Sequence, residues 1–330
     1  MPLIGLDDDT LSDAPARTAG RKPEEQGMES PILITGAAGT VGHAVCELLI
    51  RHGSKVRALV RTEDARSEKL AQLGVEVVVG DLLDLHAMHR AIEGCERVYF
   101  GMTVSASYLE ATVNVAAVAK HHDVSAFVNI SQMTVSQMGI NATTDSPQQK
   151  LHWLAEQALN WSGVPVVHVR PTSFLDTFFL RLSANSIREH RQIRLPFGDG
   201  KTSPIASEDV ARVIAAILED PGPHIGKIYE LTGPRSQDMN GVAEEFSRAL
   251  GHQITYVNVP WEPWRAQLEN SGMLSPHALA HLATMALLKQ QNRYDRLTSD
   301  VEKVTGTPPL SVYDFVRRHA GLYTAGKLQR

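Results

Sequence analysis

A glycine-rich turn between an apolar run and an amphipathic segment is the feature that most restricts how this chain folds. The apolar run at 32–34 is followed by Gly36, Gly39 and Gly42, and apolar residues then recur at helical spacing over 41–49. A strand, a tight turn and a helix in this order let the backbone approach a pyrophosphate at the positive end of the helix. We therefore expect a dinucleotide site here.

Further apolar runs indicate a parallel sheet. They lie at 56–60, 75–79, 98–100, 126–130 and 166–169, and helical patterns separate most of them. Strands that are apolar nearly throughout and alternate with helices are covered on both faces. The fold class expected is therefore α/β, a Rossmann-type doubly wound parallel sheet with a smaller C-terminal α/β lobe.

The expected domains follow from where this pattern begins and breaks. Residues 1–29 have no periodicity and the composition of a disordered N-terminal extension. Residues 30–172, together with a return segment at roughly 205–232, are expected to form the NAD(P)-binding Rossmann domain. Residues 173–204 and 233–330 are assigned to a smaller substrate-binding lobe.

Composition limits the partners of the chain. A net charge of -5, with 43% hydrophobic and 21% charged residues, is ordinary for a globular protein and predicts no nucleic-acid contact. Cys46 and Cys95 lie in apolar segments, so no disulfide framework is indicated and a reducing cytoplasm fits. No stretch is long enough to span a bilayer. We expect a cytoplasmic monomer or homodimer that acts on a small molecule.

The residue after the second expected strand bears on which dinucleotide is bound. A carboxylate there binds the ribose hydroxyls of NAD, whereas an arginine accommodates the 2′-phosphate of NADP. Arg61 follows that strand, and no carboxylate precedes Glu63. Because a guanidinium can bind two phosphate oxygens at once, NADP(H) is the preferred cofactor, with NAD(H) as the alternative. Arg61 could otherwise be a solvated residue at a strand end.

The glycine turn also carries a family resemblance. Residues 35–42 read Thr-Gly-Ala-Ala-Gly-Thr-Val-Gly, which resembles the short-chain dehydrogenase/reductase superfamily and its atypical NmrA-like branch, with NADPH-dependent quinone, azo-dye and triphenylmethane reductases. The resemblance covers roughly residues 31–320. Supporting stretches are Gly80-Asp81-Leu82, Val128-Asn129-Ile130-Ser131, His152-Trp153-Leu154-Ala155-Glu156, Ser162-Gly163-Val164-Pro165 and Arg170-Pro171.

The resemblance implies cofactor contacts at the carboxyl ends of the expected strands. It places residues 81–82 against the adenine, 102–103 along the cofactor and 171–172 near the nicotinamide. From the sequence alone, Asp81 is equally a turn residue and Pro171 equally a strand end. The expected contacts are Thr35, Gly36, Ala38, Gly39, Thr40, Val41, Gly42, Arg61, Asp81, Leu82, Met102, Thr103, Ser131, His152, Pro171 and Thr172.

The superfamily's Tyr-x-x-x-Lys pair is missing from its usual position. In that pair the lysine lowers the pKa of a tyrosine acid, but no tyrosine lies between residues 108 and 229 here. Counting back along the expected helix places Gln148 and His152 at the two positions, or Ser146 and Lys150 in the other registration. Neither registration restores the acid.

His152 is the candidate proton donor or ribose ligand in place of the pair. It lies four residues before Glu156 at the edge of a buried helical stripe, so the two side chains can touch. We expect Glu156 to orient the imidazole and raise its pKa. The alternative is a structural histidine at a helix start. Ser131 is the second candidate catalytic residue.

No metal site is assigned from the sequence. His277 and His281 lack the intervening glutamate of the zinc-protease helix. His121 and His122 precede an expected strand and read as an exposed turn. Ser131 does not lie in a nucleophile-elbow motif, so hydrolase chemistry is disfavoured.

The missing acid favours conjugated acceptors. A ketone develops a localised alkoxide that needs a proton donor, whereas a quinone or azo compound spreads the charge. The expected function is NADPH-dependent hydride transfer to such an acceptor. The alternative, also known in the NmrA-like branch, is a non-catalytic NADP(H)-binding redox sensor.

Aromatic and sulfur-containing side chains are expected to form the wall of the substrate pocket, because they would stack against the flat rings of an acceptor. The expected wall residues are Tyr108, Met133, Phe174, Phe178, Phe179, Trp261 and Trp264.

Overall fold

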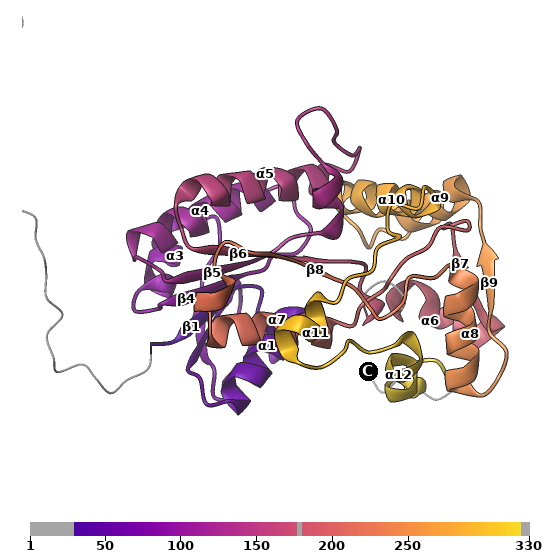
Figure 1. The fold of residues 1–330 in the computed structure, drawn as a ribbon, viewed down its shortest axis with the longest axis horizontal. Helices are drawn as coiled ribbons and strands as arrows, with labels where there is room; N and C mark the ends of the chain where they lie inside the picture. Colours follow the sequence, from indigo (N-terminus) through magenta and orange to yellow (C-terminus); the bar gives the residue numbers. More distant parts are fainter. Residues whose placement is uncertain (1–29, 177–179, 325–330) are drawn as a thin grey trace, which may run out of the picture.

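A seven-stranded parallel sheet forms the centre of the molecule (Figure 1). The computed structural model describes residues 30–176 and 180–324, so the expected extension at 1–29 lies outside the described residues. The strand order is β3-β2-β1-β4-β5-β6-β8. The strands are β1 (Ile32–Ile34), β2 (Val56–Val60), β3 (Glu76–Val79), β4 (Arg97–Phe100), β5 (Ala126–Ile130), β6 (Val166–Pro171) and β8 (Ile228–Leu231).

The strand order confirms the doubly wound fold. The chain runs outward from β1 through β2 to β3, then crosses back to β4 and continues on the other side of β1. Ligands of such sheets bind at the carboxyl ends of the strands where this reversal occurs. A ligand is therefore expected at the carboxyl ends of β1 and β4.

Helices cover both faces of the sheet (Figure 1). Ile32 and Ile34 pack into one core and Leu33 into the other, because side chains alternate along a strand. The first core contains side chains from α1 (Thr40–Arg51), α2 (Ala65–Gln72), α7 (Ser207–Glu219) and α11 (Asp300–Thr305). The second contains α3 (Leu85–Ile92), α4 (Tyr108–His121) and α5 (Pro147–Ser162).

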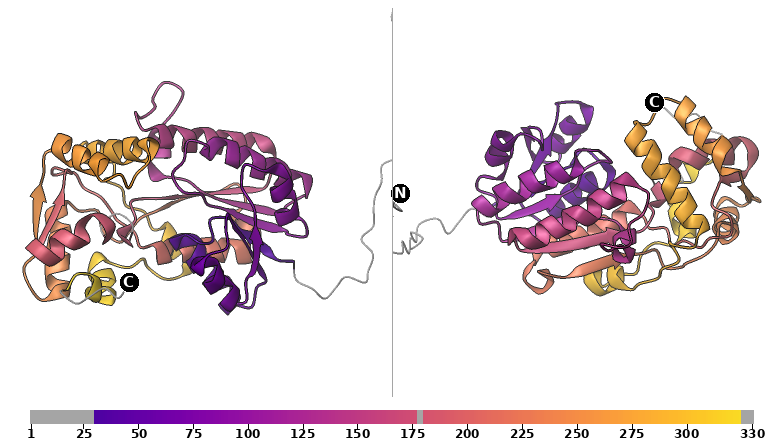
Figure 2. Two further views of the ribbon diagram at one scale, coloured as in Figure 1. Left: turned by 180° about the vertical axis from the view of Figure 1, so that it is seen from behind. Right: turned by 90° about the horizontal axis from the view of Figure 1, so that it is seen from above.

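Most elements that follow β6 share a separate hydrophobic core, and Figure 2 shows these elements at the opposite end of the molecule from α3. Its buried residues include Phe197, Phe246, Trp264 and Phe315. Its elements are α6 (Leu180–His190), β7 (Gln192–Leu195), α8 (Met239–Leu250), β9 (Thr255–Asn258), α9 (Trp261–Asn270), α10 (Pro276–Gln290) and α12 (Val312–Arg318), and β7 pairs with β9 in parallel.

Most elements pack in the core of the part of the chain to which the sequence assigned them. Helix α7 and strand β8 return to the main sheet, as the segment at roughly 205–232 was expected to do. Helix α11, assigned from the sequence to the smaller lobe, instead packs against α7, with Val301 buried in the main core. The boundaries themselves stay a prediction.

No helix in the described part of the chain is long and apolar enough to cross a membrane.

A buried lysine joins the smaller lobe to the end of β6. Lys289, in the last turn of α10, donates from Nζ to Ser173 Oγ at 2.6 Å and to Thr202 Oγ1 at 3.1 Å. The same Nζ lies 4.3 Å from the centre of the Tyr294 ring, a cation–π distance. Burial lowers the pKa of Lys289 to about 7. The charged form is thus costly in the folded state.

Replacing this lysine should change how stability depends on pH. The ordinary pKa is 10.5 and the folded value about 7, so between them the unfolded chain binds more protons and stability rises with pH. From about pH 7 to about pH 8.5, the unfolding free energy of the native protein should rise by about 1–2 kcal/mol more than that of Lys289→Met. Urea unfolding at each pH measures this.

The control for this comparison is Lys303→Met, which changes an exposed lysine of α11. Its stability should follow the native pH dependence. Equal slopes for Lys289→Met and the native protein would contradict the lowered pKa.

Candidate functional site

The glycine turn lies between the carboxyl ends of β1 and β4. Gly36 has a φ of 62°, and a Cβ on it would lie 2.5 Å from the carbonyl oxygen of Gly101, the residue after β4. The hydroxyl of Thr35 donates to Gly101 O at 3.0 Å and accepts from Gly101 N at 2.9 Å. The turn is therefore held at the point where the strand order reverses.

Two further glycines bring the turn close to the start of α1. A Cβ on Gly42 would lie 2.4 Å from Gly36 O, so the helix packs directly on the turn. Gly39 is the N-cap of α1, makes no side-chain cap hydrogen bond and is exposed, as is Thr40. The start of α1 therefore has no capping side chain on its first backbone amides, which suits a pyrophosphate. Ala38 and Val41 pack against the core beneath.

The ends of β2 and β3 lie where the adenosine of the cofactor is expected to bind. Gly80 N donates to Val60 O at 2.9 Å, so Arg61 and Asp81 follow adjacent strand ends. Arg61 is exposed and has no hydrogen bond or ion pair with any residue that the structure describes. Asp81 Oδ1 accepts from Leu83 N at 2.9 Å, which is the behaviour of a turn residue.

The loops after β3 and β4 contain the next expected contacts. Leu82 is half-buried, and its carbonyl oxygen accepts from Asn114 Nδ2 of α4 at 3.3 Å. Met102 is half-buried and Thr103 is exposed directly after Gly101. The cofactor contacts predicted in these loops thus lie on one edge of the sheet, beside the glycine turn.

Buried polar atoms without partners gather near the ends of β5 and β6. They are Ser131 Oγ, Thr172 Oγ1 and His152 Nδ1. Ser131 N donates to Val169 O at 2.7 Å, which keeps the two strand ends together. Polar atoms buried without a hydrogen bond are costly and uncommon in a folded protein. Their concentration at this edge is consistent with a polar ligand lying against them.

Tyr108 links His152 to the end of β5. Its hydroxyl donates to Ile130 O at 3.0 Å, and its ring centre lies 4.2 Å from that of His152. Complete burial raises the pKa of Tyr108 well above its ordinary value. The phenol therefore stays protonated, with its proton directed to a backbone carbonyl.

Gln148 and His152 lie one helical turn apart on α5 and touch. Gln148 Nε2 donates to His152 Nε2 at 3.2 Å, while Gln148 Oε1 accepts from Ser105 N at 3.1 Å and from His277 Nε2 at 2.8 Å. An imidazole that accepts at Nε2 carries its proton on Nδ1. Burial, assisted by nearby His281, lowers the pKa of His152 to about 3. His152 is neutral at pH 7.

The expectation that Glu156 orients His152 and raises its pKa is wrong. The Glu156 carboxylate binds Arg170 of β6 through two hydrogen bonds, from Nε at 3.0 Å and from Nη2 at 2.5 Å. Arg170 also lies 3.8 Å from Glu230 of β8. A bidentate guanidinium–carboxylate pair is stronger than a contact with a neutral imidazole. Burial without a carboxylate partner explains why the pKa of His152 falls.

The expected aromatic pocket wall is divided among different cores. Tyr108 packs with α3 and α5, and Phe174 packs against the core of α1 and α7. Trp261 and Trp264 belong to the core of the smaller lobe, and Trp261 Nε1 donates to Ala283 O at 3.0 Å. Met133 is buried in the 3-10 helix η1 (Met133–Gln137). Phe178 and Phe179 lie outside the described residues.

Residues of α10 complete the polar network around α5, and the sequence did not reveal this. His281 Nδ1 lies 2.8 Å from the Oγ of Ser146, which caps α5, and His277 binds Gln148. Their spacing of four residues placed both histidines on one helical face. It did not indicate that this face packs against α5, because the two helices are more than a hundred residues apart in the chain.

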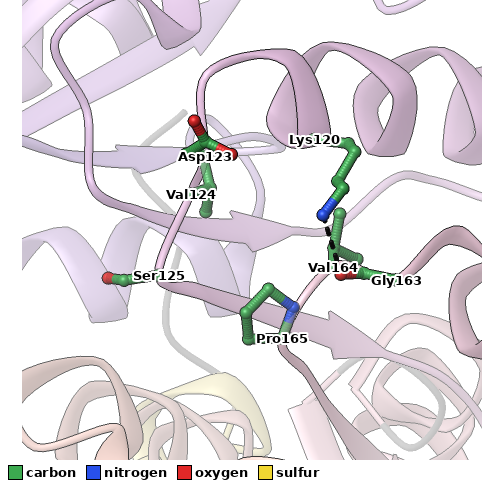
Figure 3. A pocket seen from close by; sticks show the side chains of 7 residues that line it. All are labelled: Lys120, Asp123, Val124, Ser125, Gly163, Val164 and Pro165. Atoms are coloured by element: carbon green, nitrogen blue, oxygen red, sulfur yellow. Dashed lines mark hydrogen bonds between the residues drawn. The ribbon is translucent and has the colours of Figure 1, made fainter. Parts of the chain in front are cut away.

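A small surface hollow lies at the opposite edge of the sheet and is not part of this site. It has a volume of about 210 Å³ and lies at the amino ends of β5 and β6 (Figure 3). Lys120 Nζ donates to Gly163 O across it at 3.4 Å. The hollow is lined by Lys120, Asp123, Val124, Ser125, Gly163, Val164 and Pro165.

Comparison with known families agrees with this geometry. The model of the NmrA-like family matches residues 28–316, which include the glycine turn and the polar network on α5. The chain belongs to the NmrA-like family. The resemblance inferred from the glycine turn is thereby confirmed.

Relatives of this NmrA-like chain include named reductases. NAD(P)H azoreductase of Xenophilus azovorans is 31% identical over 297 residues, which are 89% of this chain and 99% of the azoreductase. The structure of the NADPH-dependent quinone oxidoreductase of Escherichia coli complexed with NADPH has a TM-score of 0.75 and 26% identity, covering 88% of this chain and 99% of the other.

A regulator shares the fold of this NmrA-like chain. The solved structure of NmrA, a negative transcriptional regulator, in complex with NADP has a TM-score of 0.72 and 18% identity, and the match covers 88% of this chain and 95% of the NmrA chain. At that identity the likeness shows the fold alone. The residue assignments within the site, including Ser131 and His152, stay predictions.

Proposed function

We propose that this NmrA-like protein is an NAD(P)H-dependent oxidoreductase that transfers hydride to a conjugated small-molecule acceptor, such as a quinone or an azo compound. The observation that carries the proposal is the neutral polar site beside the glycine turn. Gln148, which one of the two registrations aligns with the tyrosine acid, hydrogen-bonds to uncharged His152. The azoreductase and quinone oxidoreductase relatives have names that agree with this chemistry.

The described residues fit a dinucleotide along the carboxyl edge of the sheet. The glycine turn and the start of α1 would hold the pyrophosphate, because side chains at Gly36 and Gly42 are excluded by backbone contact. Arg61 would bind the 2′-phosphate, which makes NADP(H) the preferred cofactor and NAD(H) a weaker ligand. Ser131 and Thr172 would hydrogen-bond at the nicotinamide end with their unpartnered hydroxyls.

The residues that would lie beside the nicotinamide can orient and polarise an acceptor, but they supply no strong acid. A bound nicotinamide cofactor supplies the hydride. The buried Nδ1–H of His152 can donate a hydrogen bond to a ligand oxygen or nitrogen, but the imidazole stays neutral above about pH 4 because burial lowers its pKa to about 3. Tyr108 already donates its proton to Ile130 O. Acceptors that delocalise the incoming charge are therefore favoured.

Turnover with a panel of acceptors tests the proposed function. Anaerobic NADPH consumption should be rapid with quinones or an azo dye and slow with an unconjugated ketone, because no strong acid faces the site. Catalytic turnover between about pH 5 and about pH 8 should show no step from His152, since its pKa lies below that window. The measurement is the loss of NADPH absorbance.

Two outcomes would contradict this proposal. Equal turnover of ketones and quinones would show that an acid is present at the site. Tight NADP binding without turnover of any acceptor would instead support a redox sensor of the NmrA type.

Changing Arg61 tests the cofactor preference. Arg61→Ala should weaken NADPH binding about 10-fold to 100-fold and leave NADH binding unchanged, because only NADPH presents a 2′-phosphate to the guanidinium. Calorimetric titration of both dinucleotides measures the ratio. Arg51→Ala, which removes an exposed arginine at the end of α1, is the matched control. Equal weakening of both dinucleotides by Arg61→Ala would exclude Arg61 as the phosphate ligand.

A further inference from the structure

Three histidines from two helices converge at the amino edge of the sheet. His89 lies in the last turn of α3, His121 ends α4, and His122 follows it. One ring nitrogen of each lies within 4.8 Å of the other two, and His89 Nδ1 is 2.9 Å from His122 Nε2. The ring planes differ by 30° to 87°, so the three imidazoles are tilted relative to one another.

Helix packing brings these side chains together. Helices α3 and α4 pack side by side, with Met88 and Ala119 buried in their shared core. Both helices run back from the carboxyl edge of the sheet, so their last turns lie at its amino edge. Asp123, with a φ of 50°, then turns the chain toward β5. The cluster is thus fixed by the fold and lies at the edge opposite the glycine turn.

The chemistry of the cluster suits a borderline transition metal. Neutral imidazole is a ligand of Zn²⁺, Cu²⁺ and Ni²⁺, whereas Mg²⁺ and Ca²⁺ prefer oxygen. The carboxylate of Glu93 acts electrostatically on His122 and adds negative charge beside the cluster.

The ring nitrogens need only small movements to hold an ion. Zinc–nitrogen bonds of about 2.0–2.1 Å in a tetrahedral site place ligand nitrogens about 3.3 Å apart. One pair lies slightly closer than this, and the others lie within 4.8 Å. His89 and His121 are exposed, so their rings can rotate without disturbing the core.

We propose that His89, His121 and His122 bind one divalent transition-metal ion, with Zn²⁺ as the first candidate. The ion would replace the hydrogen bond between His89 and His122 and link α3 to α4, and water would complete its coordination. The sequence places His121 beside His122, and this adjacent pair alone was interpreted as an exposed turn and not as a metal site. The third ligand comes from 33 residues away in the chain. This site is independent of the proposed reductase activity.

Titration of the metal-free protein with Zn²⁺ tests the site. Calorimetry at neutral pH should give one ion per chain, and Zn²⁺ should raise the melting temperature. His122→Ala should weaken Zn²⁺ binding about 10-fold or more and remove the thermal shift, because two imidazoles bind far less tightly than three. Co²⁺, used as a spectroscopic probe, should give the strong visible absorption of a tetrahedral site in the native protein.

Two controls separate this site from adventitious binding and from the cofactor site. His190→Ala changes an exposed histidine of α6 and should leave the affinity and the stoichiometry unchanged. NADPH affinity should be the same in His122→Ala and the native protein, because the cluster lies at the other edge of the sheet. Absence of saturable Zn²⁺ binding would overturn the proposal. Binding that His122→Ala leaves unchanged would do so as well.

Discussion

The close backbone contact between β1, β4 and α1 is the constraint on which the rest of the structure depends. Gly36 O lies 2.4 Å from the position of a Cβ on Gly42, and Gly101 O lies 2.5 Å from the position of a Cβ on Gly36. These contacts hold the start of α1 at the carboxyl ends of β1 and β4, where the strand order reverses. The turn therefore combines tight backbone packing with a helix start that no side chain caps, and the proposed cofactor path follows from that geometry.

The polar network on α5 determines what chemistry the site can perform. Arg170 holds Glu156, so no carboxylate is left to charge His152, and burial keeps the imidazole neutral. Gln148 receives hydrogen bonds from the loop after β4 and from His277 of the smaller lobe. Gln148 of the main domain therefore contacts the smaller lobe directly. A site of this kind binds and orients polar ligands and has little capacity to protonate them.

Local sequence patterns predicted the sheet and the glycine turn, because both depend on residues close together in the chain. The remaining features of the site depend on contacts between residues far apart in the chain, and local patterns do not predict such contacts. The four-residue spacing of His152 and Glu156 predicted that their side chains interact, but Arg170 of the adjacent strand β6 binds the carboxylate instead. Aromatic composition did not reveal that Trp261 and Phe174 pack in different cores. The sequence did not indicate that His89 lies beside His121 and His122, because the packing of α3 against α4 brings them together.

The most direct measurement is a calorimetric titration of NADP⁺ into the native protein and Gly39→Val. The account predicts saturable binding of one dinucleotide per chain to the native protein and loss of binding in Gly39→Val. The variant should still unfold cooperatively with a modestly lower melting temperature, because Gly39 is exposed and a Cβ on it would contact only Gly36 O, at 3.1 Å. Gly139→Val is the matched control, since a Cβ there meets nothing within 4 Å. Undiminished NADP⁺ binding by Gly39→Val would contradict the placement of the pyrophosphate on this turn.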